Sequence, residues 1–344
     1  MLAAAWVTAV ATLVLALGVP LAFVTWLGAR RADRIRQQRE QEQALTKALE
    51  QLGSADQQVR ADGVYVMERV ARDSARDYRR IMDVLTDFLR EHSRVAGPQP
   101  ATAEPRTDAA RSGTDASDRA IRPDVQAAVT VIGRRDTQRY WRPINLSRLN
   151  LVGADIADAD LAGASLTGAD LTNAILAGAK LTRAIFTDAI LMDADLRSVD
   201  LVGADLTRAN YTNAILYDAD LTGANLAGAN LTNANLTGTK LAGAALPNAI
   251  LAGANLARTN LAGANLASAD LTNAILYDAD LSGANLAGAN LTNANLNPAT
   301  DASLTNANFV GATWLEARPV PEGWVRDPRS GLRRRADSDS EEAE

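Results

Sequence analysis

The chain has 344 residues, enough for two or three domains, and its formal net charge of -6 argues against a general attraction to nucleic acid. The absence of cysteine excludes disulfides, thiol nucleophiles and thiolate metal sites, and His92 is the single histidine. No Gly-Lys-Ser/Thr phosphate loop and no Gly-x-Gly-x-x-Gly motif is present. We therefore expect no catalytic site, no metal site and no cofactor.

The chain begins with an uncharged segment, residues 2–29. About 20 apolar residues suffice to cross a bilayer. Trp6 and Trp26 lie near the two ends of this segment, and their separation along a helix would be about 30 Å, which matches the hydrocarbon thickness. These features predict one transmembrane helix. A cleaved signal peptide is the alternative, disfavoured because no basic residue precedes the apolar run.

Arginines follow this segment directly. By the positive-inside rule they place the N-terminus outside the cell and the rest of the chain in the cytoplasm, which predicts a single-pass protein of the cell membrane. The five residues are Arg30, Arg31, Arg34, Arg36 and Arg39.

Residues 30–53 predict a polar juxtamembrane helix with a thin apolar stripe of Leu45, Leu49 and Leu52. A solvated stalk is the favoured interpretation of this stripe. Continuation of the membrane helix and pairing with a second copy, which would make a homo-oligomer, are the alternatives.

Residues 54–96 predict a pair of helices. Ser54-x-x-Gln57 has the pattern of a capping box for the first helix, and Ser74-x-x-Asp77 is a candidate cap for the second. Residues 97–122 are rich in small, polar and charged residues and predict a flexible linker. Pro123 then begins a short helix over residues 123–134, which we expect to pack on the helix pair or to cover the end of the following domain.

A five-residue period dominates residues 145–316. From Leu146 to Leu296 there are 31 centre positions in one register, and 28 of them are Leu. A small residue, mostly Ala, lies two positions before each centre, and Asp or Asn usually lies one position before it. Five is a multiple of neither the helix period nor the strand period, so the pattern predicts a solenoid whose stacked coils bury the Leu column.

The coil length stays open on periodicity alone. The segment 213–220 recurs at 273–280, twelve repeat units further along the chain. Coils of three, four or six units all divide this offset evenly.

The repeat resembles the pentapeptide-repeat family, whose pattern is Ala-(Asp/Asn)-Leu-x-x. Ala204-Asp205-Leu206-Thr207-Arg208 and Ala224-Asn225-Leu226-Ala227-Gly228 match it as they stand. The resemblance implies a mainly β fold, a right-handed, four-sided parallel β-helix with Leu and Ala inward. About eight coils at strand spacing would give a rod of about 40 Å.

The helix pair is similar to a HEAT-like antiparallel unit. It also resembles a module that precedes pentapeptide repeats in membrane-bound actinobacterial proteins, for which the resemblance implies no activity. The residues that carry this likeness are Leu52-Gly-Ser54, Val59-Arg60, Gly63-Val-Tyr65, Glu68-Arg69-Val-Ala71 and Asp73-Ser74.

The register changes after Leu296, and Leu304, Phe309 and Trp314 resume the pattern for a last partial coil. Residues 317–335 predict a hairpin that caps the rod. Residues 336–344 are acidic and predict a disordered tail.

One face of the repeat departs from the pattern. If each coil has four units, large apolar side chains share an outward face, and exposed apolar patches mark binding sites. A duplication that copied these residues without selection for binding is the alternative. The candidate partner-binding residues are Ile175, Ile215, Tyr217, Asp218, Asp220, Ile275, Tyr277, Asp278 and Asp280.

The sequence thus predicts a non-enzymatic, membrane-anchored scaffold that presents a rigid β-helix to a protein partner on the cytoplasmic side. The alternative starts from acidity: residues 145–314 hold 15 Asp against seven Lys or Arg. Some pentapeptide-repeat proteins mimic DNA and bind gyrase through an acidic rod. Such an interaction would be sensitive to salt, whereas binding through Ile and Tyr would persist.

Overall fold

The computed structural model divides into two compact units, Met1–Tyr78 and Arg79–Glu344. Residues 2–20 of the expected membrane segment, residues 97–120 of the expected linker at 97–122 and the acidic tail at 336–344 lie outside the described residues. The structure describes residues 21–93, 121–140, 142–296, 313–314, 324–327 and 331–334.

In the first unit, α2 (Leu21–Leu52) packs against α3 (Gln57–Asp73). α2 runs without a break across residues 29 and 30. Leu45 and Leu52 are buried at its C-terminal end, whereas Leu49 is exposed. No helix within the described residues combines the length and apolarity needed to cross a bilayer.

The cap of α3 differs from the expected capping box. Asp56, rather than Ser54, is the N-cap, and its carboxylate accepts hydrogen bonds from the backbone amides of Gln58 and Val59. The Ser54 hydroxyl instead accepts from the Asp56 amide (3.1 Å). Asp is as good an N-cap as Ser, and it lies nearer the first helical residue. α4 (Tyr78–His92) follows, preceded by a Ser74 hydroxyl that bonds the Asp77 carboxylate (2.7 Å).

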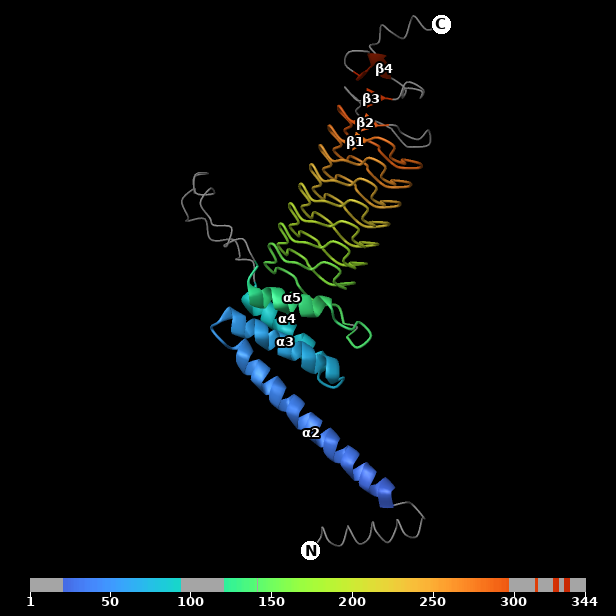
Figure 1. Cartoon of the computed structure of the whole chain (residues 1–344). Helices are drawn as coiled ribbons and strands as arrows, with labels where there is room; N and C mark the ends of the chain where they lie inside the picture. Colours follow the sequence, from blue (N-terminus) through green and yellow to red (C-terminus); the bar gives the residue numbers. More distant parts are fainter. Residues whose placement is uncertain are drawn as a thin grey trace, which may run out of the picture. The chain divides into compact units, whose positions relative to one another are not determined.

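The second unit contains the coils, which are stacked in Figure 1 from green to orange. Bridges join equivalent residues of successive coils, such as Asn145 with Ser165 and Asp155 with Ile175. Four five-residue units therefore complete one coil, which confirms the solenoid and selects the four-unit length. Backbone amides donate to carbonyls of neighbouring coils throughout, as in Leu166 to Ile185 (2.7 Å).

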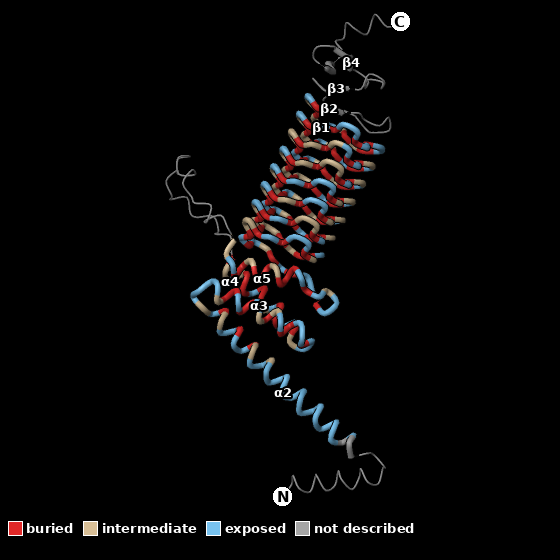
Figure 2. The backbone as a smooth tube through the Cα atoms, viewed as in Figure 1, coloured by how far each residue is buried: buried red, intermediate tan, exposed pale blue. Residues whose placement is uncertain are grey.

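Centre and small residues form the interior of the coils, which Figure 2 shows as regularly repeated buried segments. Leu176 and Ala174, for example, have no exposed surface. The second residue after each centre turns the corner in the left-handed conformation. Gly, Asn and Asp reach that conformation most readily, which explains why they recur there.

The N-terminal end of the coils is covered within the same unit. α5 (Pro123–Gly133) supplies Gln126, whose side chain exchanges two hydrogen bonds with the Asp155 backbone (2.6 and 2.9 Å). The Gly133 carbonyl accepts from the Asp160 amide, and the Ser93 carbonyl accepts from the Asn150 amide. These groups take the place of a preceding coil, so backbone groups at this edge have partners.

The last described coils form a parallel sheet of β1 (Ile275–Leu276), β2 (Asn295–Leu296) and β3 (Thr313–Trp314). Trp314 pairs with Leu296, so this coil is two residues shorter than the others and Trp314 takes a centre position. β4 (Trp324–Asp327) and β5 (Gly331–Arg334) then form an antiparallel hairpin, with β5 against β3.

Candidate interaction face

Three exposed isoleucines lie in one column of the coils. Each occupies the position before a centre Leu, and bridges connect that column from Asp155 through Ile175, Asp195 and Ile215 and onward to Ile275. Ile175, Ile215 and Ile275 are 39–42% exposed. The four-unit coil therefore brings these predicted residues to one side of the rod.

Two tyrosines stand beside this column. Tyr217 and Tyr277 each follow a centre Leu, two residues after Ile215 and Ile275. Their exposed fractions are 42% and 53%. Three coils separate the two Ile–Tyr pairs, about 14 Å at strand spacing. We call Ile175, Ile215, Tyr217, Ile275 and Tyr277 the Ile/Tyr face.

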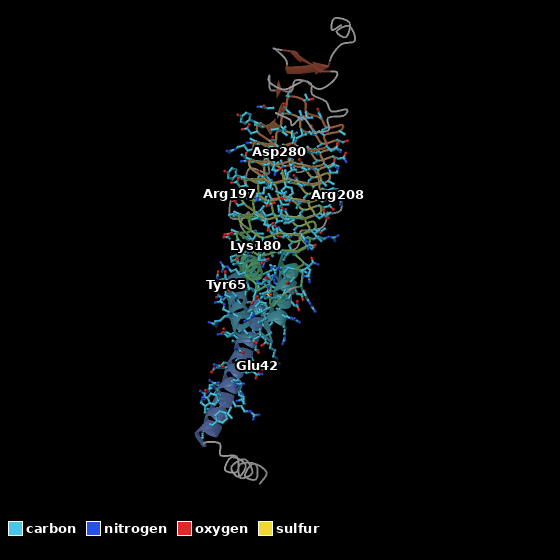
Figure 3. The ribbon with its side chains drawn as sticks, turned by 90° about the vertical axis from the view of Figure 1, so that its right-hand side faces the viewer. Glu42, Tyr65, Lys180, Arg197, Arg208 and Asp280 are labelled. Atoms are coloured by element: carbon cyan, nitrogen blue, oxygen red, sulfur yellow. The ribbon has the colours of Figure 1, made fainter. Side chains whose placement is uncertain are left out.

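An ion pair interrupts the isoleucine column. Asp195 lies between Ile175 and Ile215, and Arg197 donates to its carboxylate through Nε (2.9 Å) and Nη2 (2.6 Å). The Arg197 hydrogen bond lowers the pKa of Asp195. Figure 3 shows Arg197 and Arg208 on opposite sides of the coils. The part of the Ile/Tyr face between Ile175 and Ile215 thus combines apolar side chains with a neutralised charge pair.

Asp218 and Asp278 are exposed corner residues in the left-handed conformation (φ 55° and 56°). A Cβ at Gly238, one coil further, would collide with Oδ1 of Asp218. The side chain of Asp218 therefore lies over a glycine of the neighbouring coil, and the glycine leaves room for it.

Asp220 and Asp280 have local structural roles. Oδ1 of Asp220 accepts from the Thr222 amide (3.1 Å) and hydroxyl (2.6 Å), and Oδ2 accepts from Lys240 (3.2 Å). Desolvation raises the pKa of Asp220, but the bonds from Thr222 and Lys240 together outweigh it and lower the pKa. Asp280 accepts equivalent bonds from Ser282, which lower its pKa. These carboxylates hold turns and are less available to a partner than the tyrosines.

Sequence reasoning missed three further exposed isoleucines, Ile185, Ile190 and Ile250, which are 37–41% exposed. They occupy the same slot in other columns, so a scan of the position before each centre residue would have found them. Isoleucine in this slot is therefore not specific to the Ile/Tyr face. Among the described repeat residues, the exposed tyrosines are specific to it.

The described residues contain no group of three or more His, Cys, Asp or Glu that could hold a metal ion. His92 lies at the end of α4, where Nδ1 is 3.0 Å from the Phe88 carbonyl. In the first unit, α2 and α3 line a polar groove of about 550 Å³. Its residues are Gln37, Glu40, Gln41, Ala44, Arg69, Val70 and Asp73.

The model of the "Pentapeptide repeats" family matches the chain in eight copies between residues 145 and 313. The matched ranges include 145–188, 189–228, 214–251, 239–276, 249–288 and 274–313. No curated protein matches the chain.

Solved structures of several proteins also match the chain. HetL, a pentapeptide repeat protein involved in heterocyst differentiation regulation from the cyanobacterium Nostoc sp. strain PCC 7120, is 31% identical (TM-score 0.38) over 51% of this chain and 91% of HetL. QnrB1, a plasmid-mediated fluoroquinolone resistance protein, is 21% identical (TM-score 0.35) over 50% of this chain and 87% of QnrB1. A pentapeptide repeat protein from the Arabidopsis thaliana thylakoid lumen is 34% identical (TM-score 0.18) over 33% and 71% of the two chains.

The eight repeat matches, the unbroken Leu register and the four-unit coils agree with one another. Through residues 145–313, the chain belongs to the pentapeptide-repeat family.

Proposed function

We propose that the chain is a non-enzymatic scaffold whose coils present the Ile/Tyr face to a protein partner. The observation that carries this proposal is the repetition of an exposed Ile–Tyr pair, three coils apart in one column. Tyrosine is enriched at protein interfaces because it offers a large apolar ring and a polar hydroxyl at low entropic cost. The backbone ladder holds the two pairs at a fixed separation, so a partner binds without first ordering them.

The proposal includes attachment to the cell membrane through residues 2–29, with the coils on the cytoplasmic side. Its support is the uncharged run in the sequence and the arginines that follow it. Membrane attachment and partner binding are separable parts of the proposal.

An acidic rod that binds gyrase or another DNA-handling enzyme is the second candidate, and it receives less support. Many rod carboxylates accept hydrogen bonds from the backbone amide two residues on, as Asp170, Asp200 and Asp205 do. Asp188, Asp195 and Asp220 form ion pairs with Arg or Lys. The repeat therefore accounts for much of the acidity without a partner.

The test is crosslinking capture from the membrane fraction of cells. Tyr217→Arg combined with Tyr277→Arg should abolish capture of a partner that wild type captures, because charge and bulk replace both aromatic contacts. Capture by wild type should persist at high salt, since apolar contacts are not screened.

The chain offers a matched control in Ile190→Arg combined with Ile250→Arg. These two side chains are also exposed and also three coils apart, and they lie in another column. The control should keep the partner. Equal loss in both double variants would show that no particular face binds, and equal retention would remove the Ile/Tyr face from the function.

A further inference from the structure

We infer that residues 23–39 of α2 form a lipid-headgroup site, in which Phe23 and Trp26 enter the interface of a bilayer and the following arginines bind anionic lipid phosphates. The inference rests on the proposed attachment of the chain to a membrane. It adds a lipid class and the residues that recognise it.

The geometry starts with an aromatic cluster on the exposed part of α2. Phe23 and Trp26 stack at a centroid separation of 5.7 Å. The Arg30 guanidinium lies 4.0 Å from the Trp26 ring centroid. Phe23, Trp26 and Leu27 are 45–49% exposed. An apolar surface of this kind, adjoining a cation, is typical of helix ends at a membrane–water interface.

Two of the arginines, Arg30 and Arg34, continue the same stripe along the helix. At about 100° per residue, Phe23, Trp26, Leu27, Arg30 and Arg34 fall within about 100° of arc. Apolar rings therefore come first along this face of the helix and guanidinium groups follow. This is the order in which a helix passes from acyl chains to phosphates.

The arginines of this segment have no carboxylate partner among the described residues. Residues 21–39 hold five Arg against Asp33 alone. No ion pair in the described part of the chain joins any of the five to a carboxylate, and all five are exposed. Guanidinium groups bind phosphate oxygens through two parallel hydrogen bonds, and each basic residue near an anionic membrane adds about 1 kcal/mol.

A bilayer fits these observations better than nucleic acid or a soluble phosphate does. Only a bilayer supplies an apolar phase for Phe23, Trp26 and Leu27 next to a layer of phosphates. The uncharged residues 2–20 immediately precede this segment.

The test is flotation of the full-length chain with vesicles of phosphatidylcholine alone and of phosphatidylcholine mixed with phosphatidylglycerol. We expect binding to the anionic vesicles to be at least about 10-fold stronger, and to weaken with added salt. Replacing the five arginines by Gln (Arg30, Arg31, Arg34, Arg36 and Arg39) should remove this preference. The matched control replaces five other exposed arginines by Gln (Arg69, Arg72, Arg76, Arg79 and Arg80) and should retain it.

The possible results of this experiment distinguish the lipid-headgroup site from the membrane anchor of the proposed function. Equal binding of wild type to both vesicle types would overturn the lipid site and leave the anchor intact. Binding to anionic vesicles alone, lost in the first Gln variant, would support the lipid site and overturn a membrane-spanning anchor. Equal loss of the preference for anionic vesicles in both Gln variants would show a nonspecific effect of positive charge and overturn the inference. Displacement of the chain from anionic vesicles by a short double-stranded DNA, as effective as displacement by free anionic vesicles, would overturn it in the same way. Trp26→Ala should weaken binding to both vesicle types.

Discussion

At the scale of single residues, Tyr211 places a hydroxyl in the interior of the coils. Its side chain has no exposed surface, and its oxygen has no hydrogen-bond partner among the described residues. An unsatisfied buried polar group costs roughly 1–3 kcal/mol. Tyr211→Phe should therefore raise the free energy of unfolding by about 1 kcal/mol in urea titrations followed by circular dichroism. Tyr65→Phe, at an exposed position, should leave it unchanged.

The pH dependence of the same variant follows from burial. Desolvation raises the pKa of Tyr211 above its ordinary value of 10.0. Because the folded-state pKa is raised, the unfolded chain ionises at Tyr211 before the folded chain does. The stability of the wild type is therefore unaffected by this ionisation below pH 10 and decreases as the pH rises beyond it. The stability advantage of Tyr211→Phe over wild type should therefore widen above about pH 10. A constant difference between pH 7 and pH 11 would show that the hydroxyl is accessible to water.

The corner glycines allow a matched comparison. Gly238 and Gly223 both have left-handed backbone (φ 70° and 65°), but only at Gly238 would a Cβ meet the Asp218 carboxylate. Gly223→Ala should cost about 1 kcal/mol for the backbone alone, and Gly238→Ala should cost more. Asp218→Ala should remove the excess in a double-mutant cycle measured by thermal melting. Equal costs for the two glycines would mean that Asp218 does not lie over Gly238.

At the scale of elements, α5 completes the hydrogen-bond ladder of the first coil. The Gln126 amide supplies both a donor and an acceptor to Asp155. Gln126→Ala leaves two edge groups without their partner and should lower the unfolding free energy by about 1–3 kcal/mol. Gln126→Glu keeps the acceptor and loses the donor, so it should fall between Ala and wild type. An unchanged melting temperature for both would show that this end needs no cover.

This cap also marks the limit of what the sequence could predict. A period of five over 31 centres predicted the solenoid and its buried Leu column, because every unit repeats the same information. Gln126 lies outside the five-residue repeat and contacts a residue 29 positions further along the chain, so no local sequence pattern predicts this contact. The capping box at Ser54 failed for a related reason, since Asp56 offered an equally good cap closer to the helix. For the candidate face, the sequence predicted the column of isoleucines. Only the hydrogen bonds of the structure show that Asp220 and Asp280 hold turns, whereas the tyrosines are exposed.

At the scale of the whole molecule, the hydrogen bonds between successive coils bring residues that are distant in sequence onto one face. Deleting the four units at 241–260 removes one coil, whereas deleting the two units at 251–260 removes half a coil. Nearly all units carry Leu at the centre and Ala two positions before it, so both chains should fold and melt cooperatively. The one-coil deletion leaves Tyr277 in the column of Tyr217. The half-coil deletion turns it to the opposite side.

Crosslinking capture by these two deletions tests the central claim most directly, because neither changes any residue of the Ile/Tyr face. If both Ile–Tyr pairs bind one partner as a single surface, the one-coil deletion should retain capture and the half-coil deletion should lower it at least about 10-fold, the effect of losing about 1.4 kcal/mol of binding free energy. Circular-dichroism melts of both proteins check that folding is equal. Equal capture by the two folded deletions would contradict the proposal that this face binds the partner.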